Sequence, residues 1–207
     1  LRAYAIDEAG NQSTALVRSY LADNTAPAKV TNLRYEATAT SIILKWDHEP
    51  EADFGLFAIE QHINDSWIRI GVSETTLGYQ VNRLQPNSGY SFRVITRDKV
   101  GNESQPVVLQ AITSSDTTAP VVIRLMPRGG AFAQAIPFAA TVSDDVGITD
   151  ATLQASTDLE TWADLDVRQF AQPARQTETQ WTVQTADYDD GLLYLRVIAS
   201  DAAGNTS

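Results

Sequence analysis

The sequence lacks cysteine altogether and contains only two histidines, His48 and His62. Without cysteine, the chain can form no disulfide bond and no thiolate metal site, and it has no cysteine nucleophile. The histidines have no cysteine partner, and one histidine in a turn with another at a strand end rarely makes a ligand set. These absences exclude the commonest zinc and thiol chemistries but leave the cellular compartment open.

Long apolar runs are also missing. The longest, such as residues 120–123, extend over only a few residues, whereas a membrane-spanning helix needs roughly 18 to 20. The chain opens directly on alternating sequence instead of a basic segment followed by an apolar one, so it does not begin with a secretory signal. We therefore expect the true N-terminus to lie upstream.

Basic residues are in deficit, with 15 lysines and arginines against 26 aspartates and glutamates, giving a net charge of −11. This charge repels phosphate backbones and anionic lipid, which argues against nucleic-acid binding and membrane association. The hydrophobic fraction of 43% with 20% charged residues is ordinary for a globular protein. The chain can thus bury a core.

One sequence motif occurs three times along the chain and consists of a strand-like segment followed by Asp-x-x-Gly-Asn. Glycine and asparagine tolerate positive φ angles and so reverse the chain into a hairpin. Each copy is predicted to be the penultimate strand of a module with its turn. The copies occupy residues 4–13, 95–104 and 198–207.

A second phrase, ending in Thr-Ala-Pro, follows the first two copies, at residues 23–27 and 116–120. Proline lacks an amide donor and pushes its predecessor toward extended geometry, so these segments are predicted to be stiff linkers. We divide the chain into residues 1–24, a middle module at residues 25–117 and a last module at residues 118–207.

The dipeptide Leu1-Arg2 before the first copy recurs as Leu195-Arg196 before the third. The first segment is therefore predicted to be the C-terminal strands of a module like the last one. By the same comparison, the last module is expected to lack its final strand, and both ends are expected to be cut from a longer array.

Apolar residues alternate with period two, as in Ile42, Leu44 and Trp46 and again in Tyr90, Phe92 and Val94. This period is typical of strands, and no segment has a helical stripe. We expect about seven short strands in the middle module and an all-β chain of tandem immunoglobulin-like sandwiches. Strands of the last module are predicted near residues 121–126, 138–142, 151–156, 181–185 and 193–200.

The middle module resembles a fibronectin type III domain. The resemblance is carried by Ala26-Pro27, by Trp46 and by the run Leu84-Gln85-Pro86-Asn87-Ser88-Gly89-Tyr90. It implies that Trp46 and Tyr90 are core residues and not site residues.

The last module resembles a bacterial immunoglobulin-like module, through residues 118–120 and 143–148, Trp162 and residues 201–205. Such arrays resemble those of bacterial surface proteins, adhesins and secreted multidomain enzymes. Some adhesin modules of this kind bind calcium at their junctions.

Aspartates recur where strands end and in the linkers that those strand ends should approach. Clustered carboxylates with backbone carbonyls could supply the roughly six to eight oxygens that calcium takes. The candidates are Asp7, Asp98 and Asp201 at strand ends, Asp23 and Asp116 in linkers, and Asp144 and Asp145, which form a further cluster with Asp150. Aspartate in such a turn also caps nearby amides, and we favour this interpretation over calcium binding.

Other chemistry finds little support. Asp53-Phe54-Gly55 spells the magnesium-binding triplet of kinases, but their glycine-rich loop and catalytic loop are absent, so we interpret it as coincidence. No motif assembles a catalytic triad. Trp67 or Trp162 could stack on a sugar ring, although core packing is the favoured interpretation.

We interpret the chain as a non-catalytic spacer of a large extracellular or cell-surface bacterial protein, requiring no cofactor beyond possible calcium at module junctions. The alternative is an adhesion module that binds protein or polysaccharide. An unpaired edge in the last module could also accept residues 14–22 of a neighbouring copy.

Overall fold

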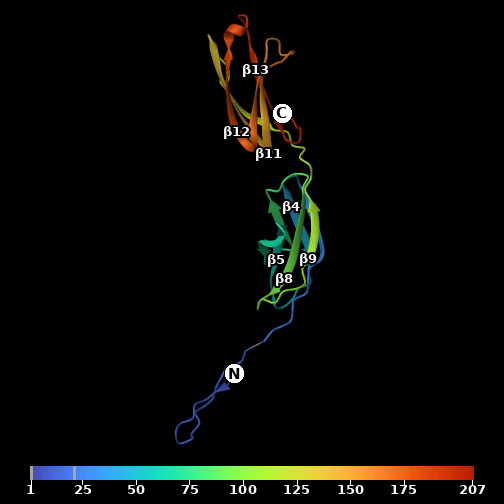
Figure 1. Ribbon diagram of the computed structural model, residues 1–207, viewed down its shortest axis with the longest axis vertical. Coiled ribbons are helices and arrows are strands. Elements are labelled where there is room, and N and C mark those ends of the chain that lie inside the picture. Colours follow the sequence, from blue (N-terminus) through green and yellow to red (C-terminus); the bar gives the residue numbers. More distant parts are fainter. Residues whose placement is uncertain (1, 21) are drawn as a thin grey trace.

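The computed structural model describes residues 2–20 and 22–207, so Leu1 and Leu21, both in the predicted first segment, lie outside the described residues. Three parts follow one another along the long axis: an N-terminal hairpin, the middle module and the last module (Figure 1). The described chain is built of strands with one short 3-10 helix, η1 (Thr185–Asp187). The prediction of an all-β chain of tandem sandwiches is confirmed. No described helix is long enough to cross a membrane.

The N-terminal hairpin consists of two short antiparallel strands, β1 (Arg2–Ala3) and β2 (Leu16–Val17). Arg2 pairs with Val17 and Ala3 with Leu16. Its side chains are nearly all exposed, so this segment buries no core of its own.

Seven strands form the middle module, the number that the sequence predicts. They lie in two sheets, ordered β3-β4-β7 and β6-β5-β8-β9. Their bounds are β3 (Thr31–Ala37), β4 (Ser41–Asp47), β5 (Phe54–Ile63), β6 (Ser66–Ser73), β7 (Gly78–Asn82), β8 (Gly89–Asp98) and β9 (Val107–Ile112). Most side chains of β3 are exposed, so this strand shows no apolar alternation in the sequence.

The core of the middle module is built from the alternating residues. Ile42, Leu44 and Phe92 are fully buried, and Trp46 packs against Phe57. Tyr90 is half-buried against this core, and its hydroxyl accepts a hydrogen bond from the Gln85 amide at 2.8 Å. Trp46 and Tyr90 therefore serve the packing role implied by the resemblance.

The last module contains four strands, β10 (Val121–Met126), β11 (Ala135–Ser156), β12 (Ala163–Gln184) and β13 (Tyr194–Asp201). Strands near residues 138–142 and 151–156 were predicted as separate; in the structure both belong to β11. A register shift between Ser143 and Ile148 divides β11, so that its first half pairs with β10 and its second half with β13. Sequence patterns found only the end of β12, because the side chains of its first half are mostly exposed.

One edge distinguishes the last module from the middle one. Strand β8 pairs with β5 on one side and with β9 on the other, whereas β13, among the described residues, pairs with β11 alone. Within the described residues, the other edge of β13, which we call its open edge, therefore has no neighbouring strand.

Candidate functional site

The three Asp-x-x-Gly-Asn turns share one geometry. In each, the aspartate amide donates to the asparagine carbonyl, at 3.0, 3.1 and 3.2 Å. The aspartate Oδ1 accepts from amides two and four residues onward, and the glycine has a φ of 85°, 102° or 89°. The predicted capping role of Asp7, Asp98 and Asp201 is thus seen directly.

The asparagines act differently from the prediction, since none of them adopts a positive φ. Each Nδ2 instead donates to Oδ2 of the aspartate in its own turn, at 2.7 to 2.9 Å. Two of them also reach a linker: Asn102 Nδ2 donates to the Asp23 carbonyl at 3.1 Å, and Asn205 Nδ2 to the Asp116 carbonyl at 3.4 Å. The turn therefore binds the linker that enters the same module.

Hydrogen bonding stabilises the ionised form of two of these aspartates. The side-chain hydrogen bond from Asn11 is the main cause that lowers the pKa of Asp7. For Asp98, burial acts to raise the pKa, but the hydrogen bonds from Asn102, Gly101 and Val100 outweigh it and lower the pKa. Both side chains are thus acceptors for the turn at neutral pH.

At the entrance to the middle module, carboxylate oxygens of Asp23, Asp53 and Asp98 lie within 4.8 Å of one another. Pairing of Phe54 with Asp98 places Asp53 beside that strand end. Asp53 is not among the candidates predicted from the sequence, where the Asp53-Phe54-Gly55 triplet resembles only a kinase motif. Its position just before β5 was the signal available in the sequence.

At the entrance to the last module, carboxylate oxygens of Asp116, Asp144 and Asp201 also lie within 4.8 Å of one another. The linker supplies Asp116, the bend in β11 supplies Asp144, and the end of β13 supplies Asp201. Pairing of Ile148 with Asp201 brings the bend and the strand end together. All three residues are candidates predicted from the sequence, and strand pairing is what groups them.

The second cluster is more deeply buried than the first. Asp116 is 7% exposed and Asp201 is 5% exposed, whereas Asp23 is half-buried and Asp53 is exposed. Burial, with the charges of Asp145, Asp201 and Asp144, raises the pKa of Asp116, although a hydrogen bond from the Thr118 amide opposes the shift. Within the described residues, no lysine, arginine or histidine forms an ion pair with the three carboxylates.

Two predicted candidates stand apart from these clusters. Asp7 lies in an exposed turn and belongs to no group of three possible ligands among residues 2–20 and 22–207. Asp145 is exposed beside Asp144. The expected grouping of Asp144, Asp145 and Asp150 does not form a ligand group in the described structure; Asp150 accepts from the neighbouring Thr149 hydroxyl instead.

Both histidines occupy packing positions. His48 packs against Phe54 at a tilted angle and edge-on against Phe57, and its Nε2 lies 3.2 Å from the Ala28 carbonyl oxygen. His62 packs edge-on against Trp67. Neither joins a group of possible metal ligands in the described part of the chain.

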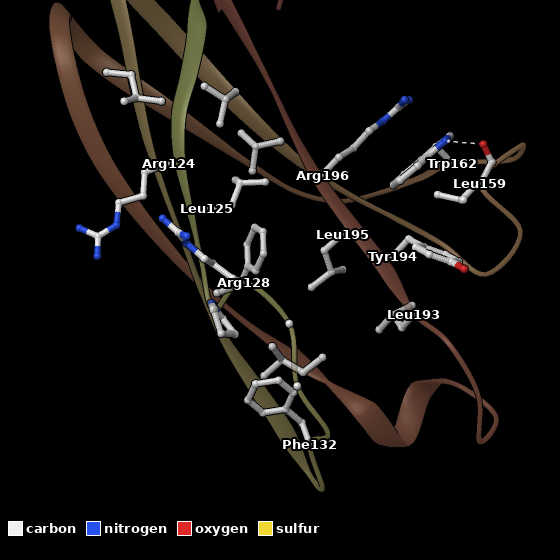
Figure 2. Close-up of a pocket in the computed structure, with 18 residues that line it drawn as sticks. Arg124, Leu125, Arg128, Phe132, Leu159, Trp162, Leu193, Tyr194, Leu195 and Arg196 are labelled. Atoms are coloured by element: carbon white, nitrogen blue, oxygen red, sulfur yellow. Dashed lines mark hydrogen bonds between the residues drawn. The ribbon is translucent and has the colours of Figure 1, made fainter.

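A second feature is an open groove of about 780 Å³ in the last module. Figure 2 shows Arg124, Leu125 and Phe132 on one side and Tyr194 and Leu195 on the other. The groove therefore lies between β10 and the open edge of β13.

The two candidate sugar-stacking tryptophans each have an arginine over the ring. The Arg196 guanidinium carbon lies 4.1 Å from the Trp162 ring centroid, and that of Arg93 lies 4.8 Å from the Trp67 ring. The Trp162 Nε1 also donates to the Leu159 carbonyl at 3.3 Å (Figure 2). One face of each ring is thus already in contact with the protein.

A search of curated proteins finds no match. Among solved structures, the crystal structure of FN3tt is 21% identical with a TM-score of 0.40, and the match covers 44% of this chain and 99% of that one. The fn3 domain of human contactin 1 is 17% identical with a TM-score of 0.41, covering 58% of this chain and 100% of that one.

Chitinase ChiA74 from Bacillus thuringiensis is 16% identical with a TM-score of 0.40, and the match covers 88% of this chain and 30% of that one. Residues 26–110 match the family profile of the fibronectin type III domain. The two sheets of the middle module, its buried Trp46 and its Tyr90 hydroxyl contact agree with that match. The chain therefore contains a fibronectin type III domain at residues 26–110.

Proposed function

We propose that the chain is a non-catalytic spacer in a large extracellular bacterial protein, where it holds other domains apart. Fibronectin type III domains are commonly structural or binding modules of multidomain proteins, and they occur in extracellular proteins. Of these two roles, structural and binding, we propose the structural one for this chain.

The observation that carries this proposal is the end-to-end arrangement of the modules. The linker enters the middle module at one end, and the chain leaves that module at the opposite end toward the last module (Figure 1). At each entrance, an asparagine of the module's own turn binds a linker carbonyl. A linker held in this way, with a proline that restricts its backbone, favours one orientation of successive modules.

Junction stiffness can be measured with two spin labels, since the chain contains no competing cysteine. We expect Gln80→Cys and Gln180→Cys, both at exposed positions in different modules, to give a narrow distance distribution by electron double resonance. Asn205→Ala removes the hydrogen bond to the Asp116 carbonyl. Because one hydrogen bond contributes about 0.5–1.5 kcal/mol, bent conformers should increase roughly two- to tenfold.

Asn102→Ala is the matched control. It removes the equivalent bond at the other junction and should leave the measured distribution unchanged. A broad distribution in the parent chain would contradict the spacer function.

The groove beside β13 supports a second candidate function, the binding of an extended protein segment. In the N-terminal hairpin, Arg2 and Ala3 pair with Val17 and Leu16, and Arg2 corresponds to Arg196 in the sequence repeat. The same register would place residues 14–22 of a neighbouring copy along the open edge of β13. Backbone hydrogen bonds along an edge strand supply affinity for such a segment.

A synthetic peptide of residues 14–22 is expected to bind the chain saturably and to shift the NMR signals of β13. Replacing both Leu16 and Val17 of the peptide with proline removes ladder donors and should weaken binding at least about tenfold. Exchange between copies should likewise produce dimers in light scattering at high concentration. Equal affinity of the two peptides would exclude edge pairing.

A further inference from the structure

Three carboxylates meet at the junction between the fibronectin type III domain and the last module. We propose that Asp116, Asp144 and Asp201 form a binding site for a hard divalent cation, specifically calcium. The site goes beyond the spacer function, because cation binding at this junction does not depend on what the parent protein does.

Each of the three side chains is already oriented by the protein. Asp116 Oδ1 accepts from the Thr118 amide at 3.0 Å, and Asp144 Oδ2 accepts from the Val146 and Gly147 amides at 2.8 and 2.6 Å. The turn of Asp201 holds its carboxylate through Ala203 and Asn205. The carboxylates are therefore preorganised and need little rearrangement to bind an ion.

Two carboxylate oxygens that accept none of these hydrogen bonds indicate that the site binds a ligand. Asp116 Oδ2 and Asp144 Oδ1 are buried and have no hydrogen-bond partner, and the Asp116 side chain is more than nine-tenths buried. A buried charged oxygen without a partner is costly, and buried polar groups in native structures are nearly always satisfied. A cation among the three carboxylates would supply the missing partner for both oxygens.

Electrostatics lead to the same conclusion. Three carboxylate charges lie close together, and two of them, those of Asp116 and Asp201, are on buried residues. Within the described residues, no basic side chain forms an ion pair with these carboxylates. The mutual repulsion of carboxylates makes ionisation of the group unfavourable. A divalent cation would remove that repulsion and join the linker to two strands of the last module.

The donor set selects the class of ion. All donors are carboxylate oxygens, with neither histidine nor cysteine, which suits calcium and magnesium better than zinc. Calcium takes carboxylate oxygens at about 2.3–2.6 Å, and one oxygen from each of the three carboxylates lies within 4.8 Å of the other two, so all three can contact a single ion. Calcium also tolerates irregular geometry, whereas magnesium demands a near-ideal octahedron.

The Asp23–Asp53–Asp98 cluster is not included in this proposal. Asp53 is exposed and Asp23 is half-buried. No buried carboxylate oxygen without a partner is found there among the described residues.

Calorimetric titration of the chelator-treated chain with calcium chloride tests the proposal. We expect saturable binding that Asp116→Asn and Asp144→Asn each weaken at least about tenfold, because each removes a charged ligand. Both variants keep an oxygen that can accept the local amide bonds, so the turns should remain intact. Asp145→Asn and Asp190→Asn are matched charge controls at exposed positions and should reduce affinity less than about threefold. Absence of binding, or equal loss in the controls, would overturn the proposal.

Thermal unfolding separates a cation ligand from a merely structural aspartate. Without a cation, Asp116 is a buried carboxylate whose Oδ2 has no hydrogen-bond partner and which lies beside two other carboxylates, so its charge does not stabilise the fold. In chelator at neutral pH, Asp116→Asn should therefore unfold at the same temperature as the parent or higher. In millimolar calcium the parent should gain several degrees that Asp116→Asn does not gain. A variant equally destabilised in both conditions would show a structural role and contradict the site.

Discussion

Replacing Trp46 with alanine is expected to destabilise the fibronectin type III domain by about 3–5 kcal/mol, the typical cost of emptying a large aromatic site in a core. Trp46 is 1% exposed and packs edge-on against Phe57, with ring centroids 5.2 Å apart. Its neighbours belong to both sheets and cannot collapse into the space without moving strands. Urea unfolding followed by circular dichroism measures the loss.

Trp67→Ala is the control for this experiment. Trp67 is half-buried and lies against Arg93 and His62 instead of the core, so its loss should cost no more than about 2 kcal/mol. The last module has a separate core that includes Trp181, and its unfolding should be unaffected by either change. Equal losses for Trp46 and Trp67 would contradict the assigned core.

Replacing Arg93 with methionine is the second change with a large expected effect, about 2–4 kcal/mol. Arg93 contacts the Glu60 carboxylate through Nη2 at 2.6 Å and Nε at 2.7 Å, and the Glu60 side chain is only 10% exposed. After the substitution, Arg69, at 3.6 Å, would be the remaining ion-pair partner of Glu60 in the described structure. A buried carboxylate with incomplete compensation destabilises the fold, which denaturant unfolding would detect.

A double variant distinguishes the stability lost because a buried charge has no partner from the stability lost because packing is removed. Glu60→Leu together with Arg93→Met removes both charges, so it should recover most of the stability lost in Arg93→Met. Arg34→Met is the exposed control: its pair with Asp47 at 3.1 Å is about half exposed on both sides and should contribute less than about 1 kcal/mol. No recovery in the double variant would mean that Arg93 acts mainly by packing.

The strands predicted correctly are those with one buried and one solvated face. Residues 41–47 and 89–98 bury alternate side chains in the core, so their period-two pattern is visible in the sequence. Strand β3 and the first half of β12 bury few side chains and carry no such pattern. They form strands because neighbouring strands supply hydrogen-bond partners for their backbone amides and carbonyls. A short stretch of sequence does not reveal which strands will be neighbours.

The repeated turns were also predictable, since Asp-x-x-Gly-Asn contains its own hydrogen-bonding partners within five residues. The contact between the asparagine and the linker was not predictable. Asn102 and the Asp23 carbonyl are 79 residues apart in the sequence, and Asn205 and the Asp116 carbonyl are 89 residues apart. For the same reason, the sequence indicated that aspartates gather near junctions but could not say which of them meet.

The amino-acid sequence by itself determined the all-β class, the fibronectin-type core and the capped turns, because each depends on local spacing and residue chemistry. Only the tertiary structure decided that Asp53 joins Asp23 and Asp98, that Asp144 joins Asp116 and Asp201, and that Asp7 and Asp145 stand apart. Those groupings follow from strand register, through the pairs Phe54–Asp98 and Ile148–Asp201. Register is set by the packing of whole sheets, which no short segment of sequence contains.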